Sequence, residues 1–135
     1  MKGFDILKYY IRRGDVYWID LGTPVGSEQG YERPCVVVQN NVGNYKSKTT
    51  IVVPTTTKSE EKHHVMHVYF CMNGVNNIAL TEQIRVISED RFMIDKYGRP
   101  KYICSLSKKT MNSIDKAIGM SIGIIPLPPK SMKKN

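Results

Sequence analysis

Residues Arg13 to Thr57 read RGDVYWIDLGTPVGSEQGYERPCVVVQNNVGNYKSKTTIVVPTTT, and this stretch decides the fold. It contains three runs rich in β-branched and aromatic residues, separated by segments rich in glycine, asparagine and charge, as in short strands joined by turns. Two similar runs follow further along the chain. Five short strands in succession predict a mainly β fold, a small closed or nearly closed barrel. The predicted strands are Val16–Leu21, Pro34–Gln39, Thr49–Pro54, His64–Cys71 and Ile78–Ile87.

The last third of the chain changes to a helical period. Ser107 is a suitable N-cap, and apolar residues recur after it at spacings of three and four, which predicts a helix laid on the barrel. These residues are Met111, Ile114, Ile118 and Ile122, and prolines at 126, 128 and 129 end the pattern. A short helix is also expected over Phe4–Ile11. We therefore expect an N-terminal arm (1–12), one folded domain (13–125) and a basic tail (126–135).

Length and composition favour one ordinary globular domain. The chain has 135 residues, of which 41% are hydrophobic and 24% charged. No apolar run approaches the roughly 20 residues that span a bilayer, and Asp5 interrupts the N-terminal segment, so we expect a cytoplasmic protein with no membrane partner. Three cysteines without CxxC spacing argue against a disulfide framework and a zinc ribbon. We expect Cys35, Cys71 and Cys104 to be buried or inert thiols.

The charge is strongly positive and unevenly distributed. The formal net charge is +8. Basic residues without intervening acids lie between Glu32 and Glu60, and a second group lies between Asp95 and Asp115. Such an excess suits phosphates, because each neutralised phosphate releases a condensed counterion. Composition alone leaves nucleic acids, membranes and acidic proteins open as partners.

The loop from Gly22 to Pro34 is the first candidate for chemistry. Its glycines permit backbone conformations that turn N–H groups inward, as phosphate-binding loops do. Arg33 precedes Pro34, which favours an extended backbone and a defined direction for a guanidinium that suits phosphate. The alternative is an ordinary hairpin connection in which Arg33 forms a surface salt bridge with Glu28 or Glu32.

Hydroxyl and imidazole groups supply further candidates. Thr55, Thr56 and Thr57 end a predicted strand and could donate to a phosphorane oxygen, although threonines are also common at strand ends. Three histidines could supply a general acid or base, which leaves a histidine-dependent ribonuclease open. A metal site is disfavoured, because residues 64 and 67 of one strand point to opposite faces. The histidines are His63, His64 and His67.

Aromatic residues interleave with the predicted strands and could stack on unpaired bases. Strand alternation buries one residue of each neighbouring pair, Tyr17 or Trp18 and Tyr69 or Phe70. We expect Tyr31 and Tyr45, which lie in predicted loops, to be the better stacking residues.

Four motifs together resemble the MazF/PemK family of toxin ribonucleases, over about residues 12–125. They are RGDVYWIDL, GSEQGYERP, QNNVGN and EQIR. The resemblance implies a Src-homology-3-like (SH3-like) barrel of about five to seven strands with a C-terminal helix packed on it. It also implies a homodimer, a cognate antitoxin with an acidic, partly disordered segment, and cleavage of single-stranded RNA at short sequences without a metal or other cofactor.

The resemblance also assigns site residues. The family's catalytic arginine falls on Arg33 in GYERP, and its catalytic threonine falls on Thr56, with Thr55 and Thr57 as alternatives. The expected substrate-binding residues are Ser27, Glu28, Gln29, Asn44 and Gln83.

The implied reaction uses a nucleophile that RNA itself carries. The 2′-hydroxyl attacks the adjacent phosphorus and expels the 5′-oxygen, which leaves a 2′,3′-cyclic phosphate and a 5′-hydroxyl. Arginine is a poor base because its pKa exceeds about 12, so Arg33, Glu28 and a histidine all remain candidates for the general base. The alternative function is a barrel module that binds single-stranded nucleic acid without cutting it.

Overall fold

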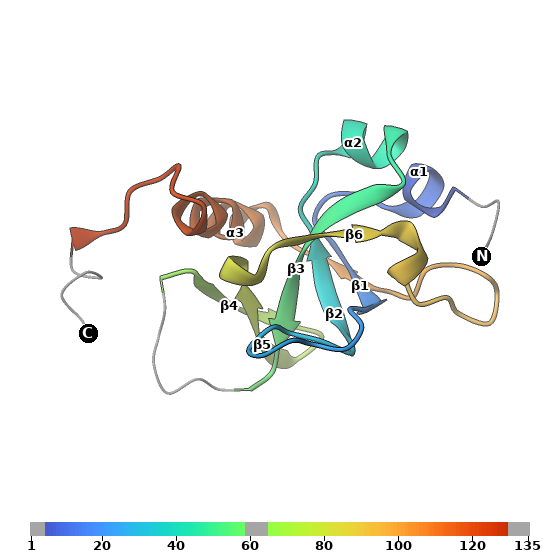
Figure 1. Ribbon diagram of the computed structural model, residues 1–135, viewed down its shortest axis with the longest axis horizontal. Coiled ribbons are helices and arrows are strands. Elements are labelled where there is room, and N and C mark those ends of the chain that lie inside the picture. Colours follow the sequence, from blue (N-terminus) through green and yellow to red (C-terminus); the bar gives the residue numbers. More distant parts are fainter. Residues whose placement is uncertain (1–4, 59–64, 130–135) are drawn as a thin grey trace.

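The computed structural model describes residues 5–58 and 65–129. These residues form a seven-stranded, curled, antiparallel sheet with a long helix on its outer face (Figure 1). The helices are α1 (Ile6–Tyr10), α2 (Asn41–Lys46) and α3 (Lys108–Ser121), with single 3₁₀ turns η1 (Thr81–Gln83) and η2 (Glu89–Arg91). The strands are β1 (Asp15–Asp20), β2 (Glu32–Val37), β3 (Thr49–Thr56), β4 (His67–Met72), β5 (Val75–Leu80), β6 (Arg85–Ser88) and β7 (Tyr102–Ser105).

Strand β3 is shared between two parts of the sheet. Strands follow the order β4-β5-β3-β2-β1-β7, while β6 pairs with the first half of β3. The chain then returns from η2 to β1, where Phe92 bridges Ile19 and the Met93 N–H donates to the Trp18 carbonyl at 3.0 Å. These contacts close the sheet into a small barrel, so the predicted mainly β barrel with a C-terminal helix is confirmed.

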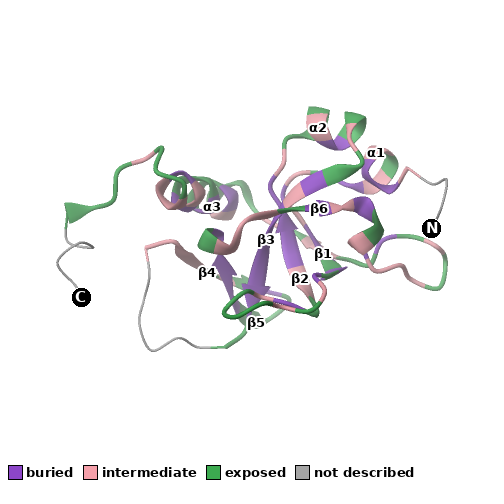
Figure 2. Cartoon of the chain, viewed as in Figure 1, coloured by how far each residue is buried: buried purple, intermediate pink, exposed green. Residues whose placement is uncertain are grey.

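The buried residues form two cores, one on each face of the sheet. Figure 2 shows burial concentrated on the central strands. The inner core fills the barrel and includes Ile6 and Leu7 of α1 and Ile11, which follows that helix. The outer core lies under α3, where Met111 and Ile114 pack on the sheet. Because both faces of the central strands are buried, β2 and β3 carry continuous apolar runs instead of strict alternation.

Helix α3 agrees with its sequence signals. The Ser107 hydroxyl oxygen accepts from the Thr110 N–H at 3.1 Å, which caps the helix as expected. Met111, Ile114 and Ala117 are buried against the sheet. Ile122 lies at the C-cap and is 56% exposed, so the apolar face ends before it.

Several predicted boundaries were wrong. The strand predicted over Ile78–Ile87 is two strands, because η1 turns the chain from the β5 side of β3 to its β6 side. Strand β7 and helix α2 were not predicted, since β7 has four residues and α2 contains a glycine. Strand β4 begins at His67, and residue 64 of the predicted strand lies outside the described residues.

No helix in the part of the chain that the structure describes has the length and apolar character needed to cross a membrane.

Candidate active site

The side chain of Arg33 is held by two backbone carbonyls at the start of β2. Its Nε donates to the Gly30 carbonyl and its Nη1 donates to the Thr55 carbonyl, both at 3.1 Å. No ion pair among residues 5–58 and 65–129 involves Arg33, so the salt-bridge alternative has no support there. The guanidinium is therefore fixed in direction while its charge stays available to an anion.

The three threonines at the end of β3 differ in their contacts. Thr55 is fully buried, and its hydroxyl donates to the Pro34 carbonyl at 2.9 Å. The Thr56 hydroxyl oxygen accepts from the Lys58 N–H at 3.2 Å, which leaves its own proton available for donation. Thr57 follows the strand and is exposed. Of the three hydroxyls, that of Thr56 is held in place by a hydrogen bond and still has its own proton to donate.

Arg33 and Thr56 line one hollow of about 530 Å³, here called the Arg33 hollow. Its walls come from β1, β2, the end of β3 and the β4–β5 hairpin, which are far apart in sequence. Sequence reasoning did not propose Asn73 and Asn77, because the hairpin that carries them reaches the site only through the β3–β5 pairing. The other lining residues include Trp18, Glu32 and Lys58.

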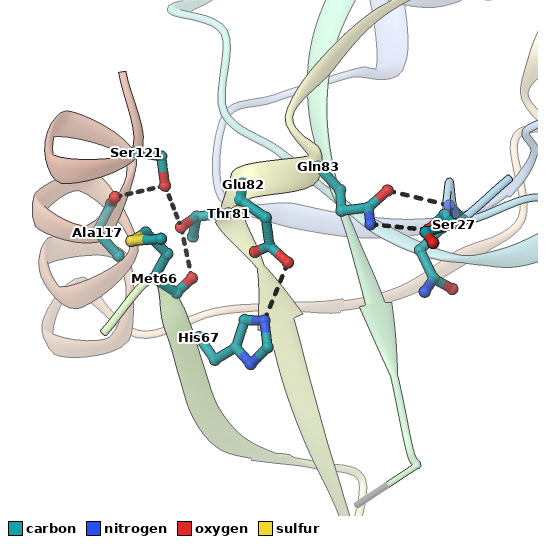
Figure 3. Close-up of polar contacts among 9 residues, drawn as sticks. Ser27, Met66, His67, Thr81, Glu82, Gln83, Ala117 and Ser121 are labelled. Atoms are coloured by element: carbon teal, nitrogen blue, oxygen red, sulfur yellow. Dashed lines mark hydrogen bonds and ion pairs between the residues drawn. The ribbon is translucent and has the colours of Figure 1, made fainter. Parts of the chain in front are cut away.

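A second hollow, of about 480 Å³, lies between the Gly22–Tyr31 loop and η1 and is here called the Gln83 hollow. The Gln83 side chain clamps the loop: its Oε1 accepts from the Gln29 N–H at 3.0 Å and its Nε2 donates to the Ser27 carbonyl at 3.2 Å (Figure 3). The Glu28 carboxylate accepts from the Val25 N–H at 3.0 Å. Four of the predicted substrate-binding residues, Ser27, Glu28, Gln29 and Gln83, are thus brought together.

The same loop supports Arg33 through Gly30. A Cβ added to Gly30 would lie 2.4 Å from the Cδ of Pro24, so the packing of the loop requires glycine at this position. The Gly30 carbonyl then accepts from the guanidinium of Arg33. A chain of contacts therefore runs from Gln83 through the loop backbone to Arg33.

The turn η1 also joins the loop to the rest of the molecule (Figure 3). Thr81 donates to the Met66 carbonyl and shares a hydrogen bond with the Ser121 hydroxyl at 3.0 Å. His67 Nε2 lies 3.0 Å from a carboxylate oxygen of Glu82. The imidazole of His67 thus faces η1, and His67 is not among the residues lining the Arg33 hollow.

Asn44 and Tyr45 differ from the prediction. Asn44 is fully buried, and its Oδ1 accepts from the Thr50 hydroxyl at 2.7 Å and from Gln39 Nε2 at 3.0 Å. Its amide holds α2 against β3 and lies in neither hollow, so it is not available to a ligand. Tyr45 lies on α2 and not in a loop, whereas Tyr31 lies in the loop with φ 59° and is 63% exposed.

Metal-ligating side chains do not gather in groups of three or more anywhere in the described parts of the chain. His63 and His64, considered above as acid-base candidates, lie outside the described residues.

Comparison with known proteins identifies relatives over most of the chain. Residues 12–122 match the family described as PemK-like, MazF-like toxin of type II toxin-antitoxin system. Endoribonuclease EndoA of Bacillus subtilis (strain 168) is 36% identical over 119 residues, which cover 85% of this chain and 97% of that protein. Endoribonuclease MazF of Staphylococcus epidermidis is 34% identical over 125 residues, covering 84% and 92%.

Solved structures show the same fold at lower identity. A crystal structure of MazF from Deinococcus radiodurans superposes with a TM-score of 0.69 at 20% identity, covering 85% of this chain and 98% of that one. An endoribonuclease from Mycobacterial species, solved in complex with its cognate antitoxin, gives 0.67 at 23% identity, covering 87% and 99%. At these identities the likeness supports the fold alone.

Proposed function

The chain belongs to the PemK-like, MazF-like toxins of type II toxin-antitoxin systems, and from this membership we propose that it is a sequence-specific endoribonuclease acting through Arg33 and Thr56. One observation carries the assignment of the site. Two groups line the same hollow: the Arg33 guanidinium, which is held by two backbone carbonyls, and the Thr56 hydroxyl, whose proton is available for donation. The substrate is single-stranded RNA, the substrate class implied by the family motifs.

The reaction needs a positioned phosphate and stabilisation of developing charge. The RNA 2′-hydroxyl attacks the adjacent phosphorus, and the bond to the 5′-oxygen breaks. Arg33 neutralises the charge that builds on the phosphorane, and Thr56 donates a hydrogen bond to the same group. A preorganised donor of this kind contributes about 10²- to 10³-fold in rate. The products are a 2′,3′-cyclic phosphate and a 5′-hydroxyl, the latter taking its proton from solvent.

We assign removal of the 2′-proton to Glu32. It is the carboxylate among the described residues that line the Arg33 hollow. Glu28, the carboxylate considered from the sequence, lines the Gln83 hollow and accepts from the Val25 N–H. A base must lie within hydrogen-bond reach of the proton it removes, so a carboxylate in the same hollow as Arg33 suits this role better.

The Gln83 hollow supplies the substrate-binding region. Glu28, Gln29 and Gln83 line it beside Arg85 and Arg91, and Ser27 adjoins it through its hydrogen bond with Gln83. Polar groups read base edges while cations hold phosphates. We therefore propose that bases next to the cleaved bond bind here.

The proposed partners are a second copy of this chain and an acidic antitoxin, in the cytoplasm. The net charge of +8 suits an acidic segment. Exposed apolar residues on the β4–β5 hairpin and after α3, among them Tyr69, Val75 and Ile124, suit burial against another protein. Sedimentation at micromolar concentration should give a dimer, and a monomer would contradict this part.

The decisive experiment incubates the protein with a long single-stranded RNA and a matched DNA, both in excess chelator, and maps the fragment ends. We expect discrete cuts in RNA alone, because DNA lacks the 2′-hydroxyl. Arg33→Ala should abolish the cuts while RNA remains bound. Arg12→Ala is the matched control, because it removes the same charge from a guanidinium that donates to the neighbouring Ile11 carbonyl and does not line the Arg33 hollow.

Two other outcomes would change the assignment. Binding without cleavage by the unaltered chain would favour the non-catalytic RNA-binding module, which uses the same cations and aromatic faces. Loss of cleavage in His67→Ala, with the fold intact, would favour a histidine-dependent mechanism.

A further inference from the structure

A third hollow, of about 720 Å³, adjoins the Arg33 hollow and has no role in the function proposed above. It lies between β1, β7 and the turn from Asp95 to Lys101, and is here called the Arg99 hollow. Trp18 lines both the Arg33 hollow and the Arg99 hollow. The two hollows therefore meet at Trp18. The turn projects at the end of the sheet away from α3, drawn in orange in Figure 1.

The turn that carries the cations is firmly built. One carboxylate oxygen of Asp95 accepts from the Tyr97 N–H at 2.8 Å and from the Arg99 N–H at 3.0 Å. The Asp95 N–H donates to the Arg99 carbonyl at 2.7 Å, and the Lys101 N–H donates to the Met93 carbonyl at 2.9 Å. The hydrogen bonds that the carboxylate accepts, first from the Arg99 N–H and then from the Tyr97 N–H, lower the pKa of Asp95. Arg99 and Lys101 are thus presented from fixed backbone positions.

The carboxylates of the hollow are occupied by internal hydrogen bonds. Asp15 accepts from the Ser105 hydroxyl at 2.6 Å and from the Tyr17 hydroxyl at 3.2 Å. Asp95 is bound to its own turn and lies 3.7 Å from Arg99 Nε. Within the described ranges no ion pair involves Lys101, which is exposed. The Arg99 guanidinium also lies over the Tyr97 ring, 5.0 Å from its centroid. Lys101 is therefore the cation of the hollow that has no internal ion pair among the described residues and is open to a ligand.

Aromatic faces complete the site. The side chains of Trp18 and Tyr102 are 40% and 56% exposed although both lie on strands. An exposed ring beside a cation suits a nucleotide, since the base stacks on the ring and the phosphate pairs with the cation. An acidic peptide would use the cations but would leave the aromatic faces without a partner of matching shape.

We propose that the Arg99 hollow binds a nucleotide of the single-stranded RNA that flanks the bases at the cleaved bond, with its base on Tyr102 and its phosphate at Arg99 and Lys101. The proposal rests on the proposed function for the identity of the RNA. It extends the path of the RNA from the Gln83 and Arg33 hollows across Trp18. It therefore makes affinity depend on nucleotides outside the recognised sequence.

Binding, and not cleavage, tests this subsite. The probe is the RNA segment around a mapped cut, with a 2′-deoxy nucleotide at the cut to prevent cleavage, in an extended form and in a form trimmed to the bases at the cut. If the chain cuts no RNA, a uridine oligomer of eleven residues and one of five replace them. A failure of the proposed function then appears as missing cuts, whereas a failure of the subsite appears in these affinities.

The variants separate stacking from charge. Tyr102→Leu should weaken binding of the extended RNA by roughly fivefold or more, while Tyr102→Phe, which keeps the ring, should bind as the unaltered chain does. For the extended RNA, Lys101→Ala should reduce the slope of log affinity against log salt concentration by about 0.7, as expected for the loss of one phosphate contact. Lys108→Ala, which removes an exposed charge from α3, is the matched control.

The trimmed RNA should bind all of these variants equally. Equal affinity of the extended RNA for Tyr102→Leu and Tyr102→Phe would overturn the proposal, as would equal losses with both RNAs. Unchanged RNA binding together with weakened binding of polyglutamate by Lys101→Ala would instead assign the hollow to an acidic protein partner.

Discussion

At the scale of single residues, the neighbouring threonines at the end of β3 have separate roles. Thr55→Val removes a buried hydrogen bond to the Pro34 carbonyl, so the free energy of unfolding should fall by about 1 to 3 kcal/mol. Thr56→Val should leave stability almost unchanged and slow cleavage by about 10²-fold, because it removes a donor to the phosphorane. Urea unfolding and single-turnover cleavage measure the two effects. The reverse pattern would move the functional hydroxyl to Thr55.

The proposed general base, Glu32, can be tested by the pH dependence of cleavage. Glu32→Gln should lower the cleavage rate at neutral pH by about 10²- to 10⁴-fold and remove the acidic limb of the pH–rate profile. Glu28→Gln is the matched control for the pH dependence and should keep the acidic limb, because that carboxylate lines the other hollow. Rates over a pH series at saturating RNA measure both. An intact acidic limb in Glu32→Gln would exclude Glu32 from the role.

The sequence predicts the position of a residue only where its neighbours in the chain determine that position. Arg33 could be placed because the following proline favours an extended backbone, which is the backbone of β2. The burial of Asn44 could not be predicted in this way. Its side chain bonds Gln39 and Thr50, which come together only when α2 packs on β3. The sequence did not predict that Trp18 and Glu32 line the same hollow, because the pairing of β1 with β2 creates that hollow.

At the scale of elements, η1 connects the Gly22–Tyr31 loop, the proposed substrate-binding loop, to the barrel. Gln83→Ala removes both hydrogen bonds that clamp the loop, and the loop supports Arg33 through the Gly30 carbonyl. We expect the single-turnover rate to fall by roughly tenfold, as misplacement of a catalytic group does. Faster hydrogen exchange at the Gln29 amide should accompany this loss, and global stability should change little.

The neighbouring side chain on η1 supplies the control. Glu82→Gln keeps the clamp and alters only the contact with His67. It should keep the unaltered exchange rate at Gln29. A slow Gln83→Ala variant with normal exchange at Gln29 would show that Gln83 acts on the RNA directly and not through the loop.

The element predictions succeeded where one pattern governs a whole element. The N-cap at Ser107 and the apolar spacing after it are local, and α3 follows them. The run from Ile78 to Ile87 has uninterrupted β character, yet the chain must leave β5 to reach the other half of β3. That break is a property of barrel closure, which the local pattern does not contain.

At the scale of the whole molecule, burial of ionisable groups in the inner core couples stability to alkaline pH. The inner core holds the Cys35 thiol. Burial raises the pKa of this thiol to about 12, although the nearby charges of Arg33 and Arg85 act in the opposite direction. Burial, with Asp15 nearby, also raises the pKa of Tyr17. The folded chain thus keeps protons that the unfolded chain releases. Stability from these groups is complete below about pH 9 and is lost as pH rises toward the folded values.

The expected result is a free energy of unfolding that falls between pH 9 and pH 12. Cys35 contributes up to one proton, or about 1.4 kcal/mol per pH unit. Cys35→Ala should be less stable at pH 7, because it loses a buried side chain, but its stability should fall less steeply above pH 9. Urea unfolding in reductant, at one fixed protein concentration, measures the slope. Cys71→Ala, at an exposed position, is the control and should keep the unaltered slope. Equal slopes for all three proteins would mean that the Cys35 thiol ionises inside the folded barrel as easily as outside it, so the inner core would have to admit water.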